Sequence, residues 1–148
     1  MDSKLQVFVS STFKDLKKHR QAAVEAILKC GHIPAGMELF VSGDKSQWDV
    51  IKKWINESDV FLLILGGRYG SKDKSTGLSY TQMEYDYAVG QGKPHFAVVI
   101  EEKALKAWAQ THSDDLLADD PAKLLTFREK VLQEQTTFFT DHRDVKLR

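Results

Sequence analysis

Val60-Phe-Leu-Leu-Ile-Leu65 decides the fold, because six consecutive apolar residues suit a central parallel strand that is covered on both faces. The glycines that follow it mark the end of that strand. Four further segments are short enough, and apolar or β-branched enough, to form strands: Leu5–Val9, 32–40, His95–Ile100 and Thr136–Thr140.

Helical segments separate these strands. Apolar residues recur at helical spacing over five ranges: Asp15–Cys30, Ser46–Glu57, Ser79–Val89, Ala104–His112 and Pro121–Gln135. Alternating strands and helices indicate a parallel sheet between two layers of helices. The sequence therefore predicts an α/β fold: a single flavodoxin-like three-layer sandwich with a five-stranded parallel sheet in the order 2-1-3-4-5.

The composition argues against nucleic-acid-binding, membrane-spanning and metal-binding proteins. The 148 residues carry 21 basic and 21 acidic side chains, whereas a nucleic-acid-binding protein usually has a basic excess. No apolar run approaches the roughly 20 residues that cross a bilayer, and no signal peptide precedes the first strand. One cysteine, Cys30, and five scattered histidines favour a cytoplasmic protein without a metal site, with Cys30 in the core. We expect residues 1–148 to form one domain without nucleic-acid or membrane partners.

Ligands of such folds bind beyond the carboxyl ends of the strands, where the strand order reverses. Here this places the segments Ser10–Lys14 and Gly66–Leu78 at the expected site. Ser10, Ser11, Thr12 and Phe13 are predicted to open the first helix, where free N–H groups and hydroxyls can hold a phosphate or a sugar. The same hydroxyls could equally serve as simple helix caps.

Gly66-Gly67-Arg68-Tyr69-Gly70 follows the central strand. Its glycines allow a backbone to approach a ligand closely, Arg68 supplies a fixed charge, and Tyr69 offers a flat surface for stacking. The alternative is a flexible turn whose arginine pairs with a surface carboxylate. The next helix begins with Ser79 followed three residues later by Gln82, which is a capping-box pattern.

Glu84 is the candidate catalytic residue. In a helical projection it lies on the inward arc between Tyr80 and Ala88, while Tyr85 and Asp86 point elsewhere. Glutamates are rarely buried unless they are paired or functional. The structural alternative is a buried salt bridge to Arg68 or Arg20. Glu38 either reaches the same cleft or bonds to a helix start.

Four motifs together resemble a bacterial domain family of unassigned function that is related to TIR domains and nucleoside deoxyribosyltransferases. They are Val7-Phe-Val-Ser-Ser-Thr-Phe-Lys-Asp-Leu16, Met37-Glu-Leu-Phe40, Leu65-Gly-Gly-Arg-Tyr-Gly70 and Ser79-Tyr-Thr-Gln-Met-Glu-Tyr85. The resemblance covers about residues 5–100. Members of that family usually form the N-terminal module of longer proteins, several of them linked to antiphage defence.

The resemblance implies cleavage of an N-glycosidic bond in NAD⁺, a nucleoside or a nucleotide, with NAD⁺ as a substrate and no resident cofactor. Glu84 matches the glutamate that meets the ribose in catalytic TIR domains and in the transferases. The other expected ligand contacts are Ser10, Ser11, Thr12, Phe13, Glu38, Arg68, Tyr69 and Tyr80. The chain departs from many NAD⁺-cleaving TIR domains because Tyr80-Thr-Gln-Met-Glu84 replaces their SxxWCxxE helix.

Three other functions remain open. An inactive TIR-like module could sense a nucleotide or self-associate as a homo-oligomer, with Trp54 and the Tyr85–Asp86 pair at an interface. Electron transfer through FMN suits the fold, but the first loop lacks the glycine that such a loop needs. A phosphoacceptor receiver domain is disfavoured because Leu65-Gly66 ends the central strand without an aspartate.

Overall fold

The computed structural model describes residues 4–12, 15–36, 45–112, 120–134, 136–141 and 143. Strands and helices alternate along these ranges, as the sequence predicts. The strands are β1 (Gln6–Ser11), β2 (Ile33–Gly36), β3 (Val60–Leu65), β4 (His95–Ile100) and β5 (Thr136–Phe139). The helices are α1 (Lys17–Lys29), α2 (Lys45–Glu57), α3 (Tyr80–Gly90), α4 (Glu102–Thr111) and α6 (Pro121–Leu132).

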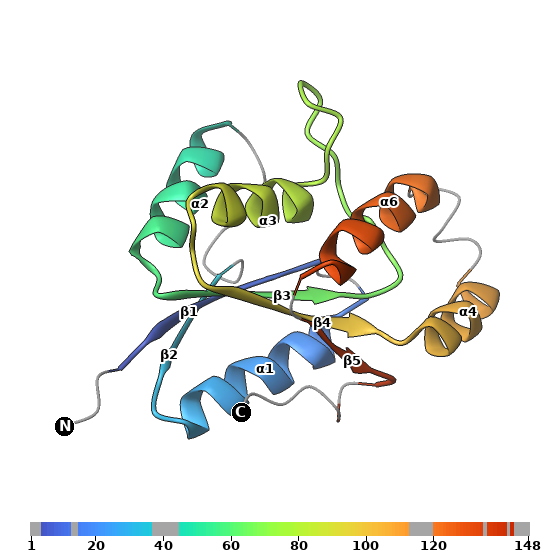
Figure 1. Cartoon of the computed structure of the whole chain (residues 1–148), viewed down its shortest axis with the longest axis horizontal. Helices are drawn as coiled ribbons and strands as arrows, with labels where there is room; N and C mark the ends of the chain where they lie inside the picture. The colour runs from blue at the N-terminus through green and yellow to red at the C-terminus, as the bar shows by residue number, and fades with distance from the viewer. Residues whose placement is uncertain are drawn as a thin grey trace.

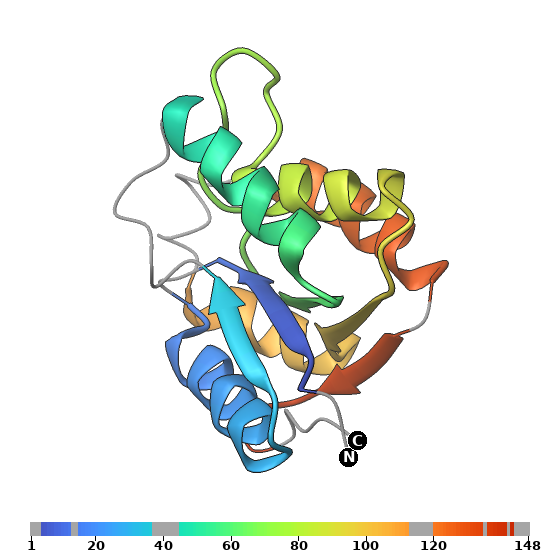
Figure 2. The same ribbon diagram turned by 90° about the vertical axis from the view of Figure 1, so that its left-hand side faces the viewer.

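The five strands form one parallel sheet in the order β2-β1-β3-β4-β5, which confirms the predicted topology. Helices α2, α3 and α6 cover one face of the sheet, and α1 and α4 cover the other (Figure 1). Turning the molecule by 90° shows the same two layers on either side of β1 and β2 (Figure 2). The chain is thus a three-layer α/β sandwich.

Each face of the sheet has its own apolar core, because successive side chains of a strand point to opposite faces. On β3, Phe61, Leu63 and Leu65 belong to the core under α2, α3 and α6. Leu62 and Ile64 belong to the core under α1 and α4. All five side chains are buried, so the continuous apolar run of β3 is explained by burial on both faces.

Helix α1 differs from its prediction at both ends. It begins at Lys17, and Leu16 at the N-cap position makes no side-chain capping bond. Ser10 and Ser11 are residues of β1, so the prediction that they open or cap the helix is wrong. Cys30, predicted to lie in the core, is exposed just after the helix.

Helix α3 buries a different face from the projected one. Its buried residues are Thr81, Glu84, Tyr85 and Ala88. Tyr85 was predicted to point outward, but its ring packs edge-on against Phe61 and Phe127. Tyr85 is therefore not available for an interface, and Asp86 pairs with Lys130 at 2.6 Å. Trp54, the other interface candidate, packs against the core under α2, α3 and α6 while remaining partly exposed.

Candidate functional site

Three hydroxyl residues at the carboxyl end of β1 contact groups from two different helices and the following turn. Ser10 Oγ donates to Glu84 Oε1 on α3 at 2.6 Å. Ser11 Oγ, one residue later, accepts from Arg20 Nη1 on α1 at 3.2 Å. Thr12 Oγ1 donates to Asp15 Oδ1 at 2.5 Å. Because alternate residues of a strand face opposite sides, this short segment connects the α3 side of the sheet to the α1 side.

Glu84 is buried at the same edge, with 3% of its surface exposed. Burial strips the carboxylate of water and raises the pKa of Glu84 to about 7, against 4.5 for an ordinary glutamate. The hydrogen bond from Ser10 and the charge of Arg20 both act in the opposite direction and lower this pKa. The site therefore holds a carboxyl group that changes its charge near neutral pH.

The salt bridge considered as an alternative role for Glu84 is absent between the described residues. Their ion pairs join other groups, and none links Glu84 to Arg20 or Arg68. Arg20 acts on the Glu84 carboxylate through space. The hydrogen-bond partner of Glu84 is the neutral hydroxyl of Ser10. A carboxyl group held in this way is not neutralised by a direct cationic contact.

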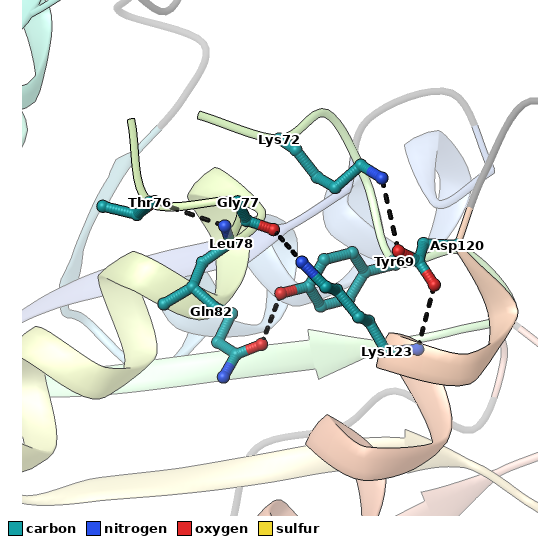
Figure 3. A network of polar contacts seen from close by, with 8 residues as sticks. All are labelled: Tyr69, Lys72, Thr76, Gly77, Leu78, Gln82, Asp120 and Lys123. Atoms are coloured by element: carbon teal, nitrogen blue, oxygen red, sulfur yellow. Dashed lines mark hydrogen bonds and ion pairs between the residues drawn. The ribbon is translucent and has the colours of Figure 1, made fainter. Parts of the chain in front are cut away.

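Tyr69 is a core residue. Its ring is 1% exposed and packs edge-on against Phe127 of α6, with the ring centroids 6.3 Å apart. Its hydroxyl donates to Gln82 Oε1 at 2.5 Å (Figure 3). The expected role of Tyr69 as a stacking surface for a base does not fit this position. The ring instead fixes the loop after β3 to helices α3 and α6.

Arg68 lies beside Tyr69 and is half-buried. Its Nε atom is buried and has no hydrogen-bond partner within the part of the chain that the structure describes. A guanidinium N–H without a protein acceptor can donate to a ligand oxygen. This observation keeps Arg68 among the candidate contacts for a phosphate or a ribose.

The rest of the loop after β3 is fastened to the first turn of α6 (Figure 3). Lys123 Nζ donates to the carbonyl oxygen of Gly77 at 2.5 Å. Lys72 pairs with Asp120 at 3.2 Å, and Asp120 Oδ1 also caps α6 by accepting from the Lys123 N–H. Sequence analysis missed these contacts because they join residues more than 40 positions apart, and an isolated lysine in a polar loop gives no signal of its partner.

The start of α3 follows the predicted capping pattern in part. Ser79 Oγ accepts from the Gln82 N–H at 3.0 Å, as a capping box requires. The Gln82 side chain does not return to Ser79, because its Oε1 atom accepts from Tyr69. Tyr80 is half-buried, and its N–H donates to the carbonyl oxygen of Ser71. Phe13 and Glu38, two further predicted ligand contacts, lie outside the described residues.

A cavity of about 160 Å³ lies at the same edge of the sheet but on the face covered by α1 and α4. Glu84 is not in its lining. We expected a hollow between the two turns that faces Glu84, and this cavity lies on the wrong face of the sheet to be that hollow. Its walls include Gly66, Gly67, Trp108 and Phe139.

The described residues include neither a cluster of metal-binding side chains nor a helix suited to a membrane. No group of three or more His, Cys, Asp and Glu side chains in these ranges is arranged to hold a metal ion. Within the same ranges, no helix combines the length and apolar character that crossing a membrane requires.

The family described as "Domain of unknown function (DUF4062)" matches residues 6–148. No curated protein matches the chain. Among the solved structures that match, the chain is similar to the TIR domains in the activated Roq1 resistosome directly recognizing the pathogen effector XopQ, with a TM-score of 0.59 and 18% identity. That match covers 96% of this chain and 95% of the other, and it shows a TIR-like α/β fold.

Proposed function

The chain belongs to the DUF4062 family, and we propose that it is an N-glycosidase that cleaves the bond between ribose and base in NAD⁺ or in a nucleoside or nucleotide. Glu84 is the proposed catalytic carboxylate. The observation that carries the proposal is its placement: a buried carboxyl group at the carboxyl edge of the sheet, hydrogen-bonded to Ser10 and without an ion pair to any cation of the described residues. Perturbed groups of this kind concentrate at functional sites.

The chemistry suits a carboxylate. When the C1′–N bond of NAD⁺ breaks, its electron pair goes to the nicotinamide, and the ribose becomes positively charged. A nearby carboxylate stabilises this charge or accepts hydrogen bonds from the 2′ and 3′ hydroxyls. Water then adds at C1′ and releases one proton, so NAD⁺ and water give ADP-ribose, nicotinamide and H⁺.

Other residues supply proposed contacts with the substrate. Arg68 Nε is buried without a protein acceptor within the described ranges, which suits a donor to phosphate or ribose oxygen. Ser10, Ser11 and Thr12 bring hydroxyls to the same edge, although each already has a protein partner. Since Glu84 is 3% exposed, the reaction requires the groups that cover it to separate when the substrate binds.

Product analysis tests the proposal. Wild-type protein at high concentration is incubated with NAD⁺ and a panel of nucleosides, and the products are identified by mass spectrometry. We expect release of nicotinamide or a free base, and a rate lower by about a hundredfold or more in Glu84→Gln, because general catalysis by a carboxyl group commonly contributes that much. Glu129→Gln, an exposed glutamate of α6, is the matched control and should retain the wild-type rate.

The pH dependence follows from the pKa of about 7. If the carboxylate is the active form, turnover should be low below pH 6 and should rise as pH passes through 7, because the ionised fraction of Glu84 rises there. An unchanged rate in Glu84→Gln, or a profile that falls over this range, would exclude Glu84 as the catalytic carboxylate.

A second function is a module that binds a nucleotide without cleaving it and that self-associates. Two observations favour it: the similar TIR domains belong to an assembled resistosome, and Glu84 is closed off by its neighbours. Ligand binding by concentrated wild-type protein without any product would support this function over the glycosidase.

A further inference from the structure

Arg20, like Glu84, is a buried charged residue. It belongs to α1, which covers the opposite face of the sheet from α3. It lies in the first turn of α1 and is 3% exposed, although arginines are almost never fully buried unless they are paired. Its Nη1 atom donates to Ser11 Oγ at 3.2 Å. The guanidinium therefore contacts the last residue of β1.

The same guanidinium also lies against the end of β2. A Cβ atom built on Gly36 would lie 2.3 Å from Arg20 Nη2, so only a glycine leaves room for the side chain. Gly36 pairs with Val9 of β1, and its φ of +153° is a conformation that other residues rarely adopt. Arg20 thus packs against the carboxyl ends of two neighbouring strands at once.

Ser11 and Ser10 connect this packing to Glu84. Ser11 accepts from Arg20, and Ser10 donates to Glu84. A displacement of the end of β1 would move both hydroxyls together, because they belong to consecutive residues of one strand. Arg20 therefore contacts the strand residue next to the one whose hydroxyl contacts Glu84.

Arg20 is also the described charge that acts on the Glu84 carboxylate. Helix α3 packs against α2, β1 and β3, and neither strand contains a charged residue. Its Tyr85 ring also contacts His95 of β4 and Phe127 of α6. The buried Arg128 of α6 donates to the carbonyl oxygen of Ile100. On α2, Asp49 and Lys52 pair with each other at the surface, and Lys53 and Glu57 are exposed. On α3 itself, Asp86 pairs with Lys130.

We propose that Arg20 is a positioning residue for Glu84: its buried guanidinium fixes the carboxyl ends of β1 and β2 and places a permanent positive charge near the candidate site. The charge is permanent because a guanidinium does not lose its proton in proteins. It favours the ionised form of Glu84, which burial alone would disfavour. The inference rests on the proposed function only where it assigns this ionised form a role in turnover.

The direct test is a titration of the Glu84 side chain. Its carboxyl ¹³C resonance, assigned by its loss in Glu84→Gln, is followed from pH 4 to pH 10 in the wild type, Arg20→Gln and Arg20→Lys. We expect the midpoint to rise by about one pH unit or more in Arg20→Gln, which is a tenfold lower ratio of ionised to protonated carboxyl group at a given pH. Arg20→Lys keeps the charge and should stay closer to the wild type.

Lys18→Gln is the matched control, because it removes one positive charge from an exposed position of the same helix. It should leave the midpoint unchanged. If Arg20→Gln does not fold, Ser11→Ala provides the test: it keeps the charge and removes the acceptor, and it should raise the midpoint measurably. An unchanged midpoint in folded Arg20→Gln or in Ser11→Ala, or an equal shift in Lys18→Gln, would overturn the proposal.

The rate of NAD⁺ turnover provides a separate measurement. In Arg20→Gln the pH at which activity is half-maximal should increase by the same amount as the titration midpoint. The rate at high pH should be largely retained. If neither the wild type nor any variant turns over NAD⁺ or a nucleoside, the glycosidase proposal fails, and the titration still decides the role of Arg20. If turnover is found and the titration does not move, the role of Arg20 fails alone.

Discussion

Glu84 is a candidate catalytic residue, and burying its ionised carboxyl group also lowers the stability of the folded protein. Its carboxyl group is buried, and among the described residues its hydrogen-bond donor is the neutral hydroxyl of Ser10. Burial strips the carboxyl group of water and favours its protonated form, and so the pKa of Glu84 rises to about 7. Above that pH the folded protein must hold a buried negative charge, which the unfolded chain would expose to water.

This residue makes stability depend on pH in a defined direction. Because its folded pKa of about 7 exceeds the ordinary value of 4.5, the folded state binds the proton more tightly than the unfolded state. The stabilisation is complete below about pH 4.5 and is lost as pH rises through 7. The difference amounts to about 3 kcal/mol of unfolding free energy across this range.

Glu84→Gln should remove this dependence, since glutamine is neutral and still accepts the Ser10 hydrogen bond. We expect the variant to melt several degrees above the wild type at pH 8 and to lose that advantage toward pH 4.5. Thermal unfolding followed by circular dichroism across this pH range measures the effect. The exposed Glu129→Gln should show no such trend, and a parallel trend in both variants would contradict the assignment to Glu84.

At the scale of elements, the end of β3 depends on close packing rather than on an open turn. A Cβ atom on Gly66 would lie 2.9 Å from Leu16 Cδ2, and one on Gly67 would lie 2.3 Å from the ring of Trp108. From the sequence we interpreted these glycines as allowing the protein backbone to approach a ligand closely. The structure fills that room with side chains from the residue before α1 and from α4, so the glycines allow two elements to approach the strand end.

Gly67→Ala should therefore destabilise the protein by about 1–3 kcal/mol, because the indole ring of Trp108 has to move. Gly90→Ala is the matched variant: it lies at the end of α3 with open space around its Cβ, and it should be neutral or stabilise by up to about 1 kcal/mol. Chemical denaturation of both variants measures the two effects. Equal free energies of unfolding in the two variants would mean that the Trp108 side chain moves aside with little loss of stability.

At the scale of the whole molecule, the sheet separates two apolar cores that share its central strand. Leu63 contributes to the core under α2, α3 and α6, and Ile64, the next residue, contributes to the core under α1 and α4. Both side chains are fully buried. Because β3 serves both cores, damage to either should reduce the stability of the entire domain.

Leu63→Ala and Ile64→Ala should each lower the unfolding free energy by about 2–5 kcal/mol, since each leaves a cavity in a packed core. We expect a single cooperative transition in both variants, with the fluorescence and circular dichroism curves coinciding. Leu125→Ala, at a position that is 55% exposed, should change stability by no more than about 0.5 kcal/mol. Two separate transitions would show that the cores unfold independently.

The sequence by itself determined the order of strands and helices, the parallel sheet and the inward position of Glu84. These follow from local patterns: a run of apolar residues, helical spacing, and the short connections that limit strand order. The buried face of α3, in contrast, could not be predicted from a local pattern. Thr81 and Glu84 are polar but buried, and Tyr85 fits either side, so the projection could not distinguish the true buried stripe.

Only the tertiary structure decided what surrounds Glu84. The hydrogen bond from Ser10 joins residues 74 positions apart, and Arg20 reaches the same region from the other face of the sheet. Tyr69 looked like a ligand surface in the sequence, yet α6 covers it in the fold. Such partners are chosen by packing between distant elements, and neither composition nor spacing within one segment records which side chain will fill a given space.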